Sequence, residues 1–286
     1  MKVGIGVPAS RGVSGSLVLD WAREADKGPF SSLATIDRLV YDNFEPLTVL
    51  SAAAGATQRI RLMTSILLAP LRNGGVLAKQ AATLDAISGG RLTLGIGVGG
   101  REDDYQVAPS PFHDRGRRLD EQLALMKRIW SGQPVGDGIG SVGPPPARFG
   151  GPEILIGAYS PPALRRAGQW ADGFLGALLP PEQMQQMHEA VREAWEEAGR
   201  SGEPRLVAAR YYRLGTGTDE TSEGYIRDYY SFAGPMAEQI VQSMLTTPEE
   251  IKETIQAYEA VGADEVILWP TVAELDQVHR LADAVG

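Results

Sequence analysis

Short apolar runs alternate with helical patterns along the whole chain, and this alternation limits the fold more than any other feature. The runs have the length and the glycine, proline or charged boundaries that are typical of buried β-strands. Eight of them occur, at Lys2–Val7, Ser31–Asp37, Ile60–Ala69, Leu92–Val98, Ile154–Gly157, Asp172–Leu178, Pro204–Leu214 and Glu265–Trp269. Strands that alternate with helices form a parallel sheet with the helices outside it. The pattern therefore predicts an α/β fold, a (β/α)8 TIM barrel in one domain over residues 1–286, with a doubly wound open sheet as the alternative.

Helical spacing fills most segments between these runs. We expect Asn43 to cap one helix, with Pro46 in its first turn. Residues 84–91 join another helix to the fourth strand, where an ion pair between Asp85 and Arg91 is expected to close the turn. Two insertions interrupt the regular pattern, at Gly99–Arg115 after the fourth strand and at Gly215–Pro235 after the seventh, and Gly132–Gly151 is expected to be a long loop. Both insertions leave the C-terminal ends of parallel strands, the face on which barrel enzymes carry their sites. They are therefore placed to close over a ligand and exclude water.

Composition excludes several classes of function. The formal net charge of −9 and the pI of about 5.0 oppose binding to nucleic acid or to an anionic membrane. Cysteine is absent, which excludes disulfides, thiolate metal sites and cysteine nucleophiles. The three histidines do not cluster, so no metal site is predicted. The N-terminal segment lacks the pattern of a signal peptide, and we expect a cytoplasmic protein.

The fourth strand carries a glycine-rich sequence at its C-terminal end, Gly95-Ile96-Gly97-Val98-Gly99-Gly100. A dinucleotide fingerprint would need a helix directly after these glycines at the first strand–helix turn, whereas a charged insertion follows them here. We expect the glycines to let a flat ring approach the backbone, with tight packing inside the strand as the alternative.

Asp37 and Arg38 end the second predicted strand, where a carboxylate and a guanidinium would both face a bound ring. His113 in the first insertion is a third catalytic candidate, as an acid, base or ligand contact, and its alternative role is that of a solvated loop residue. Ser160 precedes two prolines and is expected to cap a helix, whose free N–H groups would attract a phosphate. An ordinary cap without a ligand is the alternative.

Aromatic and charged residues near other strand ends also have access to this face. Arg101, Asp103, Asp104 and Tyr105 follow the fourth strand, and their alternative role is a solvated charged loop. Arg210, Tyr211 and Tyr212 alternate along the seventh strand, so only some of them point inward. Trp269 ends the eighth strand, where it would either stack on a flat ligand or fill the barrel.

Several blocks carry a family likeness. The block Ala78–Gly99, which includes Leu84-Asp85-Ala86-Ile87-Ser88-Gly89-Gly90-Arg91, resembles the most distinctive block of the luciferase-like monooxygenase family. Further matches follow in the expected order, at residues 57–62, 103–105, 115–121, 154–160, 171–173 and 262–266. The resemblance covers nearly the whole chain and implies a TIM-barrel oxidoreductase that binds a flavin or a deazaflavin.

The resemblance also implies positions for the cofactor. A non-proline cis peptide bulge in the third strand would lie behind the ring, at Thr64, Ser65 and Ile66. Further cofactor contacts would come from the fourth strand and from the turn that receives the phosphate, at Gly97, Val98, Gly99, Ala158, Tyr159 and Ser160.

Two departures from the family leave the cofactor open. The luciferase proper has an arginine for the flavin phosphate where this chain has Val98, and many deazaflavin-dependent members have Asp-His where this chain has Asp37-Arg38. The leading hypothesis is a monooxygenase or reductase that uses reduced FMN on a small organic substrate. The alternatives are hydride transfer with coenzyme F-420 and a non-catalytic flavin-binding subunit. The resemblance further implies a homodimer, with a separate flavin reductase as a second partner.

Overall fold

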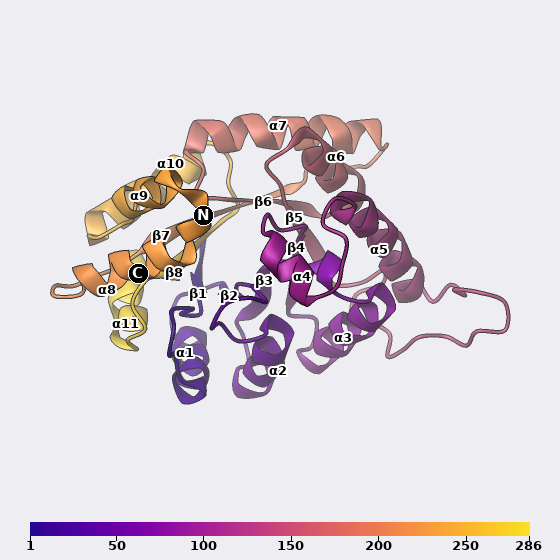
Figure 1. Cartoon of the computed structure of the whole chain (residues 1–286), viewed down its shortest axis with the longest axis horizontal. Coiled ribbons are helices and arrows are strands. Elements are labelled where there is room, and N and C mark those ends of the chain that lie inside the picture. Colours follow the sequence, from indigo (N-terminus) through magenta and orange to yellow (C-terminus); the bar gives the residue numbers. More distant parts are fainter.

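Eight parallel strands close into a barrel in the computed structural model, which describes all 286 residues. The strands are β1 (Lys2–Gly6), β2 (Ser32–Thr35), β3 (Arg61–Leu68), β4 (Leu92–Gly97), β5 (Glu153–Gly157), β6 (Gly173–Ala177), β7 (Arg205–Tyr212) and β8 (Glu265–Pro270). Each strand pairs with the next along the chain, and β8 pairs with β1, so the sheet has no free edge (Figure 1). The prediction of a (β/α)8 barrel is confirmed, and the open sheet is excluded.

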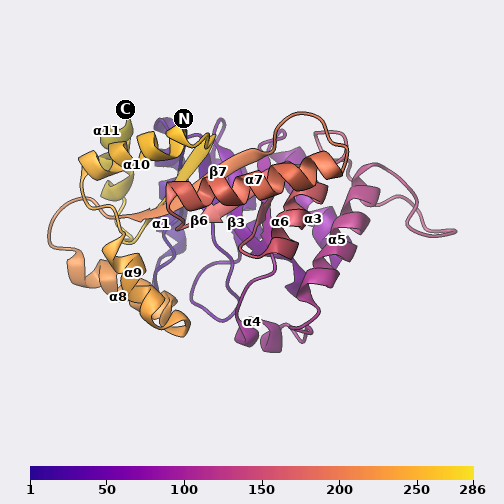
Figure 2. The same cartoon turned by 90° about the horizontal axis from the view of Figure 1, so that it is seen from above.

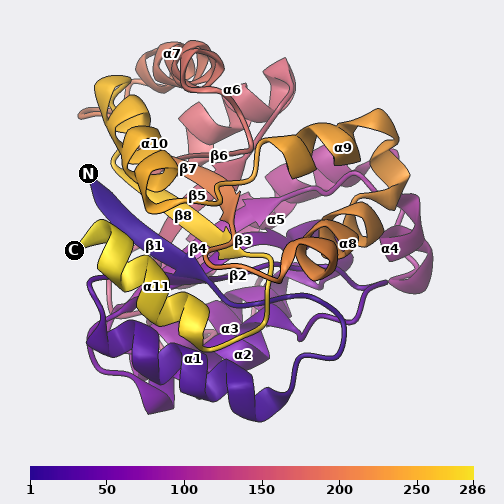
Figure 3. The same cartoon turned by 90° about the vertical axis from the view of Figure 1, so that its left-hand side faces the viewer.

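Helices surround the strands (Figure 3). They are α1 (Gly15–Lys27), α2 (Pro46–Ala56), α3 (Gly74–Ile87), α4 (Glu102–Val107), α5 (Arg115–Trp130), α6 (Pro161–Trp170), α7 (Pro181–Glu197), α8 (Asp219–Tyr229), α9 (Pro235–Gln242), α10 (Pro248–Ala260) and α11 (Asp276–Val285), with 3-10 turns η1 (Ala69–Leu71) and η2 (Ser231–Ala233). The two predicted insertions contain α4 and α8. Figure 2 shows α4, α8 and α9 gathered on one side of the barrel, opposite the two termini. No helix has both the length and the apolar character that a membrane span requires.

Three local expectations are corrected. The second strand ends at Thr35, and Asp37 and Arg38 lie in the loop beyond it. Glu45, not Asn43, caps α2, because its carboxylate accepts the N–H of Thr48 at 2.7 Å.

The expected ion pair between Asp85 and Arg91 does not form. The Arg91 guanidinium instead donates to backbone carbonyls that include those of Ile60 and Ala54, while Asp85 accepts the N–H of Ala147. Arg91 therefore ties the start of β4 to the end of α2, and Asp85 anchors the long loop before β5.

Alternation along each strand divides the core in two. In β7, Leu206 and Ala208 belong to the layer between barrel and helices, whereas Val207 and Tyr211 point into the barrel. The interior cluster continues through inward residues of other strands. It ends in the rings of Tyr211 and Trp269 at the C-terminal face. Side chains therefore fill the barrel interior up to its C-terminal face, and a site can lie only beyond them.

A bulge in β3 shapes the C-terminal end of this barrel core. The register with β4 shifts between Thr64 and Leu67, and the Ser65–Ile66 peptide bond is cis, as the family resemblance implied. The Ile66 side chain occupies the space above Gly97. A Cβ added to Gly97 would lie 1.9 Å from Cδ1 of Ile66. An added Cβ on Gly95 would lie 2.0 Å from the Thr64 carbonyl oxygen. The structure shows the close packing that was the alternative interpretation of these two glycines, because both admit the neighbouring strand.

This packing predicts an asymmetric response to alanine. Gly95→Ala should lower the free energy of unfolding by about 1–3 kcal/mol, because the new methyl group meets backbone that cannot rotate away. Gly55→Ala in α2 is the matched control, since nothing lies within 4 Å of its added Cβ, and it should raise stability by up to about 1 kcal/mol. Denaturant unfolding of both variants measures the difference. Equal effects would contradict the close approach of β3 and β4.

Candidate functional site

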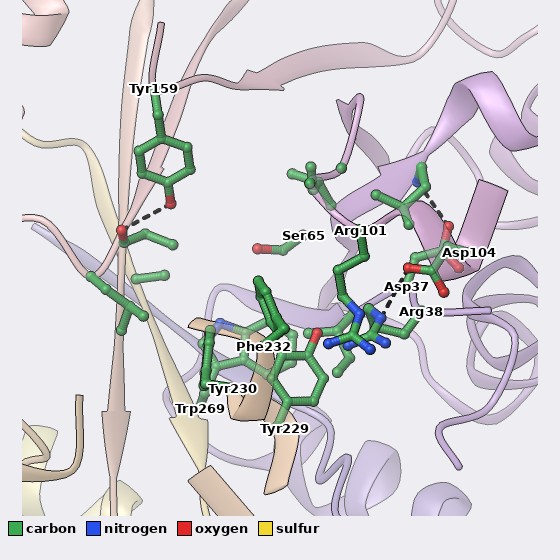
Figure 4. Close-up of a pocket in the computed structure, with 18 of the residues that line it drawn as sticks. Asp37, Arg38, Ser65, Arg101, Asp104, Tyr159, Tyr229, Tyr230, Phe232 and Trp269 are labelled. Atoms are coloured by element: carbon green, nitrogen blue, oxygen red, sulfur yellow. Dashed lines mark hydrogen bonds and ion pairs between the residues drawn. The ribbon is translucent and has the colours of Figure 1, made fainter. Parts of the chain in front are cut away.

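A cavity of about 260 Å³ opens at the C-terminal ends of the strands (Figure 4). Its walls come from the loop after β2, the β3 bulge, the turn after β4, the ends of β6, β7 and β8, and the segment from α8 to η2. Most of its lining is apolar, and a few charged groups reach it from one side. This combination is typical of a pocket for a small organic molecule or a cofactor ring.

The predicted site residues divide into two groups. Those that line the cavity are Asp37, Arg38, Ser65, Ile66, Gly99 and Tyr159. Those outside its lining are Thr64, Gly97, Val98, Ala158, Ser160 and His113. Thr64 donates its hydroxyl to the Gly95 carbonyl inside the barrel, and the Val98 carbonyl accepts the hydroxyl of Tyr105.

His113 is exposed and packs beside Phe112, with ring centroids 6.0 Å apart. It lies away from the cavity lining, as its alternative role of a solvated loop residue would have it.

Asp37 is buried at the cavity wall, and its carboxylate is fully engaged. It accepts the N–H of Leu68 at 2.7 Å and both terminal nitrogens of Arg72, at 2.5 and 3.2 Å. A second carboxylate, Glu45, accepts from the same guanidinium at 3.0 Å. A bidentate pair of this kind fixes position strongly. Asp37 therefore holds the end of β3 against the loop after β2.

Arg38 is held by Asp104, which enters from the first turn of α4. Asp104 Oδ2 accepts Arg38 Nε at 3.0 Å, and Oδ1 accepts the N–H groups of Leu39 and Val40 at 2.9 and 2.7 Å. Arg38 Nη2 donates to the Val40 carbonyl at 3.0 Å. Its Nη1 is buried and has no hydrogen-bond partner. A buried donor without a partner costs free energy. A ligand that accepts from Nη1 would break no existing hydrogen bond, but the side chains that cover this atom would have to move.

The two insertions meet beside the cavity. Arg101 from the turn after β4 lies over the ring of Phe232 from η2, with 4.5 Å between the guanidinium carbon and the ring centroid. Deeper in the cavity wall, Arg38 lies 5.5 Å from the ring centroid of Tyr229 in α8. Cation–π contacts of this type are attractive, and more so where water is excluded. The insertions thus act as walls of one site and not as separate loops.

The tether that holds α8 to the barrel lies at the surface. Asp228 accepts Arg11 Nε at 2.7 Å and the hydroxyl of Tyr41 at 2.8 Å. The positive Arg11 side chain and these hydrogen bonds hold the pKa of the Asp228 carboxyl below its usual value. Loops after β1 and β2 are thereby linked to the helix that carries the aromatic wall.

That aromatic wall consists of Tyr211, Tyr229, Tyr230, Phe232 and Trp269. The hydroxyls of Tyr211 and Tyr230 are hydrogen-bonded at 3.1 Å, and the rings of Tyr229 and Tyr230 meet edge to face at 4.9 Å. Burial raises the pKa of Tyr229 to about 12, although the positive charge of Arg38 opposes this shift. The wall is therefore neutral at physiological pH.

Leu178, at the end of β6, also faces the cavity and has an unusual backbone. Its φ of +60° lies in the left-handed region, which bulky residues rarely adopt. Its N–H donates to the Ala209 carbonyl at 2.9 Å, which fixes the conformation. Strained residues of this type gather at functional sites.

The turn after β5 has the geometry expected for a helix cap. Ser160 is the N-cap of α6, and Pro161 and Pro162 form its first turn. The hydroxyl of Ser160 makes no capping hydrogen bond, whereas the N–H of Ala163 already donates to the Ser160 carbonyl at 2.9 Å. Fewer backbone N–H groups are therefore free to bind a phosphate at the start of α6 than the sequence suggested.

The sequence interpretation missed several residues of the cavity. It gave no role to the tyrosines of the second insertion, or to Arg72, Leu178 and Phe232. The closely spaced rings at positions 225, 229, 230 and 232 were the available signal. A helical spacing of four residues places Tyr225 and Tyr229 on one face, which is the face that packs on the barrel.

The fold and the cavity first define a class, a TIM-barrel enzyme with its site among the C-terminal strand ends. The sequence model of the family described as luciferase-like monooxygenase matches residues 4–280. The chain therefore belongs to the luciferase-like monooxygenase family, whose members are oxidoreductases that use a flavin or a deazaflavin.

Relatives in mycobacteria support this assignment. An uncharacterized protein of Mycobacterium tuberculosis is 30% identical over 207 residues, which cover 63% of this chain and 72% of that protein. The phthiodiolone/phenolphthiodiolone dimycocerosates ketoreductase of the same organism is 34% identical over 171 residues, which cover 55% of this chain and 44% of the ketoreductase.

Solved structures agree in fold along the whole chain. A monooxygenase from Streptomyces bottropensis has a TM-score of 0.83 at 22% identity, covering 100% of this chain and 98% of that one. An F420-dependent secondary alcohol dehydrogenase has a TM-score of 0.81 at 17% identity, covering 99% and 97%. The FMN-bound oxygenating constituent of 3,6-diketocamphane monooxygenase from Pseudomonas putida has a TM-score of 0.76 at 20% identity, covering 99% and 95%.

The Arg38–Asp104 pair predicts a strong effect on stability. Asp104→Asn should lower the free energy of unfolding by about 3–5 kcal/mol, because it leaves the buried Arg38 charge without its principal partner. Asp114→Asn is the matched control: its ion pair with Arg117 is exposed, and its loss should cost less than about 1 kcal/mol. Urea denaturation of both variants measures the two values. A small effect at Asp104 would show that the pair does not hold the site together.

Proposed function

We propose that the protein is a monooxygenase or reductase that binds reduced FMN in the described cavity and acts on a small organic substrate. The observation that carries the proposal is the Arg38 side chain, which lines the cavity and whose buried Nη1 has no hydrogen-bond partner in the chain. Reduced flavin is commonly anionic, and a positive group near the ring stabilises that form. The charge and the free donor of Arg38 are the features such a ring requires.

The other residues around the cavity fit a flat ring as well. Ser65 and Ile66 form one wall, and Figure 4 shows the Ser65 side chain reaching into the open space across from Tyr159 and the aromatic wall. Gly99 and Leu68 extend this side of the cavity, and they carry no charge. Beyond Tyr159 and outside the cavity lining, Ser160 retains a free hydroxyl at the start of α6, where helix N–H groups attract phosphate. We assign the ring to the β3 side and the phosphate to this turn.

Bound reduced flavin would supply electrons, either to oxygen or directly to the substrate. The protein's own contribution follows from the residues present. Arg38 would hold negative charge at the ring edge, with Asp104 fixing its orientation. The aromatic wall would exclude water, and the contact between Arg101 and Phe232 would keep the two insertions in place above the ring. A separate flavin reductase would supply the reduced cofactor.

Hydride transfer with coenzyme F-420 is the second candidate. This chain has Val98 at the position where the luciferase proper has an arginine for the flavin phosphate, and this difference weakens the case for FMN. The likeness to a ketoreductase and to an F420-dependent alcohol dehydrogenase favours this candidate. A flavin-binding subunit without catalysis is a third possibility that the sequence left open. Affinity for FMN and for F-420, each in oxidised and reduced form, separates the candidates. Tight binding of the deazaflavin alone would replace the FMN proposal.

The role of Arg38 predicts a selective loss of affinity. Arg38→Gln should weaken binding of reduced FMN by about tenfold to a hundredfold, the range for losing a hydrogen bond to a charged group, and should weaken oxidised FMN less. Arg117→Gln, at an exposed ion pair on α5, is the control and should leave both affinities unchanged. Anaerobic fluorescence titration measures them. If Arg38→Gln weakens both forms equally, the guanidinium does not act on the charge of the reduced ring.

A further inference from the structure

The cavity has two chemically different halves. The β3 half is formed by Ser65, Ile66, Leu68 and Gly99, and its side chains are aliphatic or small. The aromatic half is the wall of Tyr211, Tyr229, Tyr230, Phe232 and Trp269. Apart from Tyr159, every aromatic ring that lines the cavity comes from β7, β8 or the insertion between them. The aromatic side chains are therefore concentrated opposite the side that we assign to the cofactor.

The rings of the aromatic half form a continuous surface. Tyr230 and Phe232 are nearly parallel, with ring centroids 6.2 Å apart and 29° between their planes. Tyr211 meets Tyr230 edge to face at 6.1 Å. The rings thus pack on one another both face to face and edge to face, and aromatic ligands bind such surfaces more strongly than saturated ligands of equal size. None of the five residues carries a charge at neutral pH, and the two arginines in contact with them, Arg38 and Arg101, are paired with Asp104 and Asp103. This half therefore favours an uncharged ligand.

Two polar groups in this half make no hydrogen bond within the chain, the hydroxyl of Tyr229 and the indole N–H of Trp269. The hydroxyl of Tyr230 is occupied by Tyr211, whereas the hydroxyl of Tyr229 makes no hydrogen bond within the chain. Figure 4 shows Tyr229 extending between Phe232 and the guanidinium groups of Arg38 and Arg101. Because burial raises the pKa of Tyr229 to about 12, its hydroxyl keeps its proton at any working pH and can donate it in a hydrogen bond.

We propose that the aromatic half binds an uncharged, planar aromatic ketone, with its ring against Tyr230 and Phe232 and its carbonyl oxygen accepting the Tyr229 hydroxyl. Tyr229 is then a residue that positions the substrate carbonyl toward the β3 half. The inference rests on the proposed function, because it takes the β3 half as the place of the cofactor. It goes further by naming the substrate class and the group that orients it.

Binding of two matched ketones tests the ring. 1-Tetralone and 1-decalone share a fused two-ring skeleton and a ketone, but only the tetralone has an aromatic ring. Calorimetric titration of the full chain should give an affinity for 1-tetralone about threefold to tenfold higher than for 1-decalone. Phe232→Leu should reduce this preference. Phe232 is 53% exposed, so the protein should tolerate the change. Phe149→Leu, in the loop before β5 and 89% exposed, is the control and should keep the preference.

A second pair tests the hydroxyl. Tetralin lacks the carbonyl of 1-tetralone and is otherwise the same molecule. Tyr229→Phe removes only the hydroxyl, and it should weaken 1-tetralone by about twofold to tenfold while leaving tetralin unchanged. Equal losses for both ligands, or no loss for either, would overturn the assignment of Tyr229.

The outcomes also separate this inference from the proposed function. FMN affinity is measured independently, and the ketone titrations are repeated with saturating oxidised FMN. If FMN binds and the preference for 1-tetralone persists, both proposals stand. If FMN binds but the protein does not prefer 1-tetralone to 1-decalone, or loses this preference when FMN is bound, the substrate inference fails while the proposed function stands. If neither FMN nor F-420 binds, the proposed function fails, and the division of the cavity fails with it.

Discussion

The site depends on one packing constraint, the fit of the β3 bulge against the glycines of β4. Ile66 occupies the space above Gly97, and the Thr64 carbonyl approaches Gly95, so no larger residue fits at these positions. This contact closes the top of the barrel core and turns Ser65 toward the cavity. The same glycines that suggested a ring against the backbone instead admit a neighbouring strand, and the cavity begins one layer further out.

The roles of the charged residues at the cavity follow from this packing of β3 against β4. Asp37 fixes the end of β3 through the N–H of Leu68 and is neutralised by Arg72, so it serves structure. Asp104 plays the corresponding role for Arg38, but it leaves Nη1 free. Asp37 and Arg38 thus differ in function, because both oxygens of Asp37 accept hydrogen bonds within the chain whereas Arg38 retains an unused donor. The insertions complete the arrangement, since α4 supplies Asp104 and α8 supplies the ring over Arg38.

The architecture could be predicted from the sequence, because the length of each apolar run and its alternation with helical patterns are local features that determine strands and helices directly. Strand order, both insertions and the site of the β3 bulge followed from pattern or family likeness. Side-chain roles were harder to predict, since they depend on partners distant in the chain. Asp37 pairs with Arg72 and Arg38 with Asp104, and no local pattern indicates which pair remains incomplete. Tyr211 and Trp269 were predicted as candidates for this face, whereas Tyr229, Tyr230 and Phe232 were missed because the second insertion reaches the cavity only in three dimensions.

The central claim is that the cavity between the β3 bulge and the aromatic wall holds the cofactor ring beside Arg38. A crystal structure of the protein soaked with FMN tests it most directly. We expect the ring to lie against Ser65 and Ile66, with Arg38 Nη1 about 2.7–3.2 Å from a ring oxygen or nitrogen. A ring bound elsewhere on the protein, or a ring in the cavity with Nη1 still without a partner, would show that Arg38 does not hold the cofactor there.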